Sequence, residues 1–105
     1  MPAIHIVKND RSLPQITPIE RGSDVFRSGY WVMAEATANA LIGGKIYFHV
    51  QQAKPSFYGG VITGAKKIER GKYAGRILFT FQFSQSCRGV TTSHEGWGRE
   101  MKIIL

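Results

Sequence analysis

The residue types best suited to covalent chemistry lie close together, just after the most phenylalanine-rich part of the chain. Cys87, His94 and Glu95 are the types of a nucleophile, a general base and the group that orients that base. Nearness in sequence does not fix geometry, and a lone cysteine beside a phenylalanine-rich segment is more often a buried small hydrophobic residue. We therefore predict no catalytic residue from this group.

The histidines and glycines do not form a metal or cofactor motif. His5, His49 and His94 have neither the helical nor the finger spacing of zinc ligands. No phosphate loop or dinucleotide fingerprint is present, since the pair Gly59 and Gly60 does not precede an expected helix. We expect neither a metal nor another cofactor.

Aromatic, basic and amide side chains gather around the middle of the chain. Bases stack on aromatic rings at about 1–3 kcal/mol each, lysine and serine hold phosphate oxygens, and glutamine reads base edges. The pattern predicts a nucleotide-contacting loop. The alternative is a strand–turn–strand connection whose aromatic residues merely pack. The members are His49, Gln51, Gln52, Lys54, Ser56, Phe57 and Tyr58.

A second polar group follows Cys87 and is broken by glycines, as functional loops often are. Trp97, with Arg88 and Arg99, has the composition of a stacking and phosphate site, or of a cap over a pocket. The alternative is a loop that buries Trp97 under the expected barrel. The other polar members are Thr91, Thr92, Ser93, His94 and Glu95.

Five basic residues surround a single carboxylate, Glu69, in an expected hairpin. Such a cluster attracts phosphate groups without reading sequence, and its effect depends on salt. The alternative is a solvated hairpin tip. The basic residues are Lys66, Lys67, Arg70, Lys72 and Arg76.

Composition and charge set the class of protein. A chain of 105 residues, 43% hydrophobic and 20% charged, predicts one globular domain. Fourteen lysines and arginines face seven acidic residues, a formal net charge of +7, which favours a polyanionic partner. Residues 1–52 carry a net charge of +1 and residues 53–105 one of +6, so the surplus is one-sided.

The compartment follows from what the sequence lacks. No apolar run reaches the roughly 18–20 residues of a membrane span, and residues 1–5 do not resemble a secretory signal. One cysteine cannot form an internal disulfide. We expect a cytoplasmic protein that does not bind a membrane.

The pattern of apolar residues predicts a mainly β domain of about five strands with one or two short helices. Strands are expected at residues 3–7, 45–50, 58–68, 76–83 and 101–105, with a bulge or a tight bend at Gly64. The alanine-rich residues 34–41 predict a helix that ends before Gly43. Residues 8–29 are expected to form a long connection, and residues 30–33 fit a strand or the start of the helix. Glycine-marked turns between short strands favour a small barrel.

Three segments of the sequence resemble one known protein superfamily. Residues 30–33 (YWVM), 41–49 (LIGGKIYFH) and 58–65 (YGGVITGA) are similar to the PUA-like superfamily, in particular its EVE and ASCH branches. Gly44 stands where that family usually has aspartate. The resemblance implies a β-barrel with a flanking helix that binds RNA or modified DNA, with an aromatic pocket for an extruded base in the EVE branch. Some ASCH members hydrolyse a modified nucleoside, which makes an amidohydrolase using Lys54 or Lys45 the alternative.

The sequence therefore predicts a single PUA-like domain, residues 1–105, that binds RNA or single-stranded or modified DNA. A third reading is a phage or mobile-element inhibitor whose basic face docks on an acidic protein, and a homodimer is also compatible with the phenylalanine-rich strand. The residues expected to bind nucleic acid are Trp31, His49, Lys54, Ser56, Phe57, Tyr58, Lys66, Lys67, Arg70, Lys72, Arg88 and Trp97.

Overall fold

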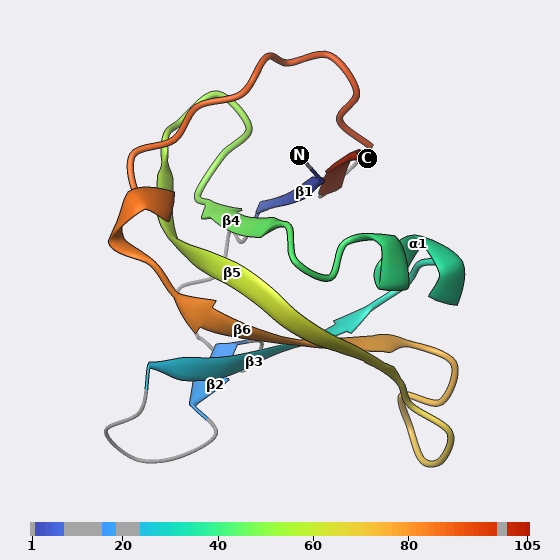
Figure 1. Ribbon diagram of the computed structural model, residues 1–105. Coiled ribbons are helices and arrows are strands. Elements are labelled where there is room, and N and C mark those ends of the chain that lie inside the picture. The colour runs from blue at the N-terminus through green and yellow to red at the C-terminus, as the bar shows by residue number, and fades with distance from the viewer. Residues whose placement is uncertain (1, 8–15, 19–23, 99–100) are drawn as a thin grey trace.

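One curved sheet of seven strands organises the chain (Figure 1). The computed structural model describes residues 2–7, 16–18, 24–98 and 101–105. The strand order is β2-β3-β6-β5-β4-β1-β7. The pair β1 and β4 is parallel, and every other neighbouring pair is antiparallel.

The strands and helices are numbered in the order in which they occur along the chain. The strands are β1 (Ala3–Val7), β2 (Ile16–Pro18), β3 (Val25–Trp31), β4 (Lys45–His49), β5 (Ser56–Lys67), β6 (Ile77–Phe83) and β7 (Met101–Ile104). The helix α1 (Glu35–Ala40) lies between β3 and β4, and the 3₁₀ turn η1 (Gln85–Cys87) follows β6.

Alternation along the strands creates an inner face that forms the core. The side chains of Ile77, Phe79 and Phe81 on β6 are buried. Those of Ile46 and Phe48 on β4 are buried as well. The other buried members of this core cluster come from β1, β3, β5, α1 and the residue that caps α1. They are Ile4, Ile6, Trp31, Ala38, Leu41 and Ile62.

The strand β5 is the longest and lies between β4 and β6 at the centre of the sheet. Its register against β6 shifts between Ile62 and Gly64, where the sequence predicts a bulge or a tight bend. Bulges add twist and bend the strand that carries them. This bend matches the strong curvature of β5 in Figure 1.

The predicted mainly β class with a short helix is confirmed, and the architecture differs from a closed barrel. The sheet has two edges, β2 and β7, which do not pair with each other in the described part of the chain. The expected last strand, β7, lies beside β1. Part of the long connection expected over residues 8–29 is strand, because β3 pairs with β6 from Val25 onward. The rest of that connection, residues 8–15 and 19–23, lies outside the described residues.

No helix within the described residues has the length and apolar character needed to cross a membrane.

We predict opposite effects for two glycines of β5. A Cβ at Gly60 would clash with the carbonyl group of Gln82 on the paired strand, whereas a Cβ at Gly64 would meet only the Thr80 Cβ, at 3.9 Å. Gly60→Ala should lower the free energy of unfolding by about 1–3 kcal/mol or prevent folding. Gly64→Ala should be neutral or stabilise by up to about 1 kcal/mol. Urea unfolding measures both, and equal effects would contradict the packing described here.

Candidate functional site

The outer face of the sheet carries a second buried layer, and this layer is polar. His5 on β1, Tyr47 and His49 on β4, and Lys102 on β7 alternate with core residues on their strands. Tyr47 and Lys102 lie directly opposite His5 in the register of the two neighbouring strands. His5, His49 and Lys102 are at most 7% exposed. Three ionisable side chains are therefore buried in one patch.

Residues 88–98, here called the covering segment, lie over this patch. The backbone of Gly89 and Val90 is hydrogen-bonded to that of Ser56 at the start of β5. At its other end the ring of Trp97 contacts those of His5 and His49 edge-on, with centroids 6.2 and 5.7 Å away. Figure 1 shows this segment arching from η1 over β4 and β1 to β7. The covering segment therefore excludes water from the patch.

The two histidines form a directed hydrogen-bond chain. His49 Nδ1 lies 2.8 Å from the carbonyl oxygen of Lys54, which only accepts, so Nδ1 carries the proton. The other nitrogen of a neutral His49 ring, Nε2, then accepts from His5 Nδ1 at 2.8 Å. This leaves the lone pair of His5 on Nε2, for which no hydrogen bond to a described residue is formed. The Lys54 carbonyl thus fixes the tautomer of the neutral His5 ring, with the proton on Nδ1 and the lone pair on Nε2.

Burial keeps both rings neutral at physiological pH. Desolvation, helped by the neighbouring His49 and by the charge of Lys102, lowers the pKa of His5 to about 4. Desolvation also lowers the pKa of His49, against the opposing effect of the Lys54 carbonyl. His5 is also stacked on Tyr47, with ring centroids 4.6 Å apart. Burial and the nearby Cys87 raise the pKa of Tyr47, which stays neutral as well.

Lys102 brings a positive charge into the same patch. Its Nζ donates to Thr92 Oγ1 at 2.8 Å, to the Ser93 carbonyl at 2.8 Å and to Ser93 Oγ at 3.0 Å. An ammonium group has the three donors that these contacts need, and the charge of Lys102 is one of the causes that lower the pKa of His5. All three are neutral, and Lys102 forms no ion pair with another described residue. A buried cation with no carboxylate beside it is costly unless an anion or several hydrogen bonds offset the lost hydration.

Trp97 supplies a donor without an acceptor. Its indole Nε1 is buried and has no hydrogen-bond partner among the described residues. Leaving such a donor unpaired costs about 1–3 kcal/mol. The patch therefore combines an ammonium group, an unpaired N–H donor and an aromatic nitrogen that accepts.

Some residues predicted to bind a ligand hold this region together. Ser56 is buried, and its hydroxyl donates to the Cys87 carbonyl at 2.6 Å and accepts from the Val90 N–H at 3.0 Å. The side chain of Lys54 is exposed, and its backbone carbonyl is the group that His49 uses. The two residues contribute backbone and hydroxyl groups that fix the covering segment and the histidines.

Arg88, Tyr58 and Phe57 lie at the end of the sheet where β5 begins. The Arg88 guanidinium lies over the rings of Tyr58 and Phe83, 5.9 and 5.7 Å from their centroids. Its Nε donates to the Phe57 carbonyl at 3.0 Å. Tyr58 also contacts Phe26 edge-on. Desolvation raises the pKa of Tyr58, against the charge of Arg88.

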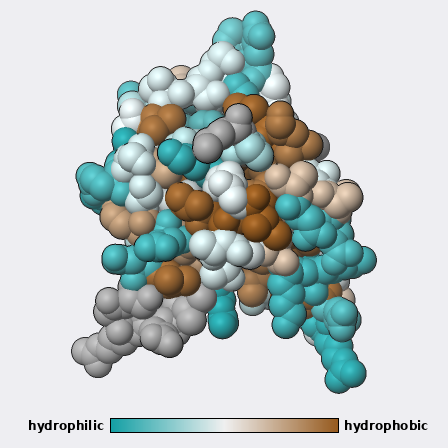
Figure 2. Space-filling model, in the orientation of Figure 1, coloured by the Kyte–Doolittle hydropathy of each residue, from teal (hydrophilic) through white to brown (hydrophobic). Residues whose placement is uncertain are grey.

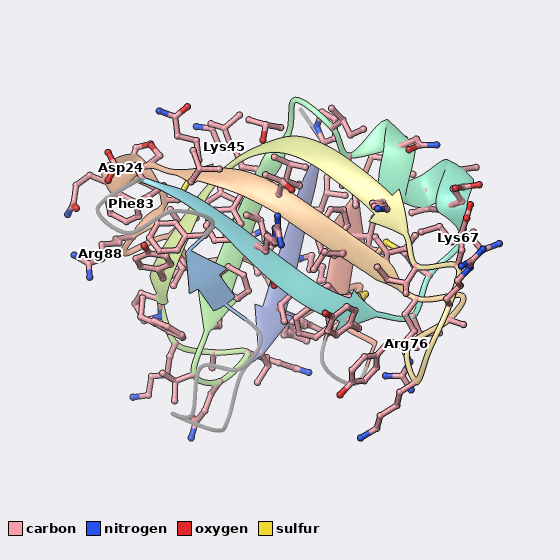
Figure 3. The ribbon with its side chains drawn as sticks, turned by 90° about the horizontal axis from the view of Figure 1, so that it is seen from below. Asp24, Lys45, Lys67, Arg76, Phe83 and Arg88 are labelled. Carbon is pink, nitrogen blue, oxygen red and sulfur yellow. The ribbon has the colours of Figure 1, made fainter. Side chains whose placement is uncertain are left out.

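Two further groups of predicted residues lie elsewhere. Trp31 is in the core, 5% exposed, and its indole donates to Ser28 Oγ at 3.0 Å, so its ring is not offered to a ligand at the surface. The basic hairpin forms the opposite end of β5 and β6 from Arg88. Figure 3 shows Lys67 and Arg76 at one end of the sheet, with Phe83 and Arg88 at the other. The predicted residues thus fall into separate groups and do not line one pocket.

The residue types of a catalytic triad do not meet. Cys87 is fully buried, while His94 and Glu95 are exposed. No hydrogen bond links Cys87 to either of them in the described part of the chain. Arg99, which the sequence grouped with them, lies outside the described residues.

Sequence reasoning missed His5, Tyr47, Lys102 and the roles of Thr92 and Ser93. The one local signal is a histidine or lysine at alternate positions of apolar strands, as in residues 3–7 and 101–104. This alternation places the residue on the outer face of the sheet but does not predict that this face is buried. The parallel pairing of β1 with β4, which brings His5 to His49, has no local signature.

Comparison with family models, with curated proteins and with solved structures found no match for this chain. What can be stated from the fold is its class, a mainly β domain with one open, curved sheet.

The buried histidines predict a loss of stability in acid. The unfolded His5 ring takes up its proton near pH 6.5, whereas the folded ring does so only near pH 4. Its contribution to stability is therefore complete above pH 6.5 and falls as the pH drops toward 4. Between pH 7.5 and pH 5 we expect a loss of about 2 kcal/mol in the free energy of unfolding from this group.

Urea unfolding at the two pH values measures this loss. His5→Asn keeps a donor for His49 but no longer titrates, so its loss should be smaller by about 2 kcal/mol. His94→Asn, at an exposed position, is the matched control and should behave like the unmodified protein. An equal acid loss in the His5→Asn and His94→Asn proteins would show that His5 does not titrate as described.

Proposed function

We propose that this chain is a nucleic-acid-binding domain of PUA-like type and that the β5–β6 hairpin is its phosphate-contacting surface. The observation that carries the proposal is the gathering of five exposed cations at one end of the sheet. Lys66 and Lys67 end β5, Arg70 and Lys72 lie in the connecting loop, and Arg76 precedes β6. None of the five forms an ion pair with another described residue. Their charge is therefore available to a polyanion.

The hairpin is held rigidly against the sheet by a pair of tyrosines. Tyr73 in the loop stacks on Tyr30 of β3, with centroids 4.1 Å apart and planes 3° from parallel. Lys72 and Arg76 lie over the Tyr73 ring at 5.5 and 5.8 Å. Because a fixed cation loses less side-chain entropy on binding, this arrangement favours contact with phosphates. In Figure 2 the hairpin lies at the lower right and is mostly hydrophilic.

The strands beside the hairpin extend the positive field. Strands β3, β4, β5 and β6 contain no aspartate or glutamate. On their outer face Lys45 lies across from Val61, and Arg27 across from Thr80, in the part that the covering segment does not contact. A strand of nucleic acid on this face would meet no carboxylate of these four strands.

The resemblance to PUA-like domains supports the same reading. The three similar segments lie at the end of β3, in the turn and strand that follow α1, and in β5. These strands contribute the central part of the sheet. That superfamily binds RNA or modified DNA. The open sheet and the separation of the aromatic residues depart from the barrel and single base pocket that the resemblance implies.

Charge removal at the hairpin tests the proposal. Replacing Lys66, Lys67, Arg70 and Lys72 by glutamine should weaken binding to a labelled single-stranded RNA or DNA at least tenfold at low salt. It should also flatten the plot of log K against log salt by up to about 3, since each phosphate contact contributes about 0.7 for a single strand. Fluorescence anisotropy at several salt concentrations measures both.

The matched control removes charge at the other end of the sheet. Tyr58 and Lys66 are eight positions apart on β5, roughly 26 Å at 3.3 Å per residue. Lys54→Gln with Arg88→Gln should change the salt dependence less than the hairpin variant does. Absence of binding by the unmodified protein, or equal effects of the two variants, would overturn the hairpin assignment and favour a protein partner.

A further inference from the structure

The buried polar layer under the covering segment has chemistry that the hairpin does not use. It holds one ammonium group, Lys102, and one buried N–H, Trp97 Nε1, that lacks an acceptor among the described residues. It also holds an aromatic nitrogen, His5 Nε2, whose lone pair is set by the chain of hydrogen bonds to the Lys54 carbonyl. The Trp97 ring lies edge-on to the His5 ring, with centroids 6.2 Å apart, and Lys102 lies directly opposite His5 in the register of β1 and β7.

The charges in this layer favour an anion. The ionisable groups that face His5 are Lys102 from β7 and Tyr47 and His49 from β4. Burial keeps Tyr47 and His49 neutral, and Lys102 is therefore the charged member. Among the described residues no carboxylate contacts it. A negatively charged group placed here would gain a charge-assisted hydrogen bond and relieve the cost of the buried cation.

The hydrogen-bonding pattern narrows the kind of anion. Lys102 and Trp97 donate, so the ligand needs oxygen atoms that accept. His5 Nε2 accepts, so the ligand also needs a proton to donate. A phosphate monoester has both in its singly protonated form, which is the major form below its second pKa near 6. Sulfate has a similar shape but is a dianion without a proton at this pH.

From this juxtaposition we infer that Lys102, Trp97 and His5 form a binding site for a phosphate monoester beneath the covering segment. Thr92 and Ser93, which now hold the Lys102 ammonium, release part of it when the anion binds. The site is separate from the basic hairpin, and the inference does not depend on the proposed function. Such a phosphate belongs either to a small molecule or to the end of a nucleic-acid strand.

NMR titration of the intact protein tests the inference. At pH 6, where much of the ligand is singly protonated, ribose 5-phosphate and inorganic phosphate should shift the Trp97 indole N–H signal and the His5 Nε2 signal, with sulfate at equal ionic strength binding more weakly. The Trp97 signal is identified by its loss in Trp97→Phe. Lys102→Met, close in length and without charge, should weaken phosphate binding about tenfold or more. Lys45→Met, at a lysine of the same outer face away from the covering segment, is the matched control and should bind as before.

Two more variants keep the test decisive. His5→Asn removes Nε2, and should reduce the preference for phosphate over sulfate. If Lys102→Met does not fold, Trp97→Phe, which removes the N–H donor and keeps an aromatic ring of smaller size, should still weaken phosphate binding. Equal affinity for phosphate and sulfate, unchanged binding by these variants, or no shift at millimolar phosphate would overturn the inference.

Oligonucleotides distinguish a phosphate at the end of a nucleic-acid strand from that of a small molecule. A 5′-phosphorylated oligonucleotide that binds tighter than its 5′-hydroxyl form, with the difference lost in Lys102→Met, supports a strand end as the ligand. Equal binding of the two oligonucleotides, with ribose 5-phosphate still bound, supports a small molecule. The hairpin variant should keep its affinity for ribose 5-phosphate, so the two proposals fail independently.

Discussion

The parallel pairing of β1 with β4 is the constraint on which the rest of the structure depends. Parallel neighbours need a long crossover, and here it runs from Val7 to Lys45 and contains β2, β3 and α1. The pairing also places β1 between β4 and β7, so His5 has Tyr47 on one side and Lys102 on the other. Without it the core would lose Ile4 and Ile6, and the two histidines would not meet.

A consequence of this arrangement is that the sheet buries both of its faces at one end. The inner face is apolar along its length, whereas the outer face is buried only where the covering segment lies. A buried polar layer is stable only if its groups are hydrogen-bonded. His5 Nδ1, both ring nitrogens of His49 and Lys102 Nζ meet that condition through named partners. Among the described residues the buried N–H of Trp97 does not.

Much of the fold could be predicted from local sequence, because strict alternation of apolar and polar residues predicts a strand. Residues 77–83 alternate between phenylalanine or isoleucine and smaller or polar side chains, and they form β6. The alanine-rich run gave α1, and Gly64 marked the bulge in β5. The strand β3 was missed over residues 25–29 because its residues alternate poorly and contain Gly29. Its extended state comes from pairing with β6, which is a tertiary effect.

The candidate site was less predictable than the fold for a related reason. The basic hairpin is contiguous in sequence, so charge counting alone located it. The polar layer is assembled from β1, β4, β7 and the covering segment, and only His49 and Trp97 among its central members stood out beforehand. His5 and Lys102 each look like an outer-face residue of a short strand. They become part of a buried polar layer only because β1 pairs with β4 and β7 and because the covering segment lies over them.

The two regions differ in how they would discriminate between ligands. The hairpin cations are exposed, so water and salt screen their attraction, which favours any long polyanion without selecting among them. Lys102 and the histidines are shielded from water, where charge and hydrogen-bond direction count for more. Of the fourteen lysines and arginines, five lie exposed in the hairpin and one, Lys102, lies buried under the covering segment. Because the chain is short, β5 joins both regions, ending at Lys66 and Lys67 in the hairpin and beginning at Ser56 under the covering segment.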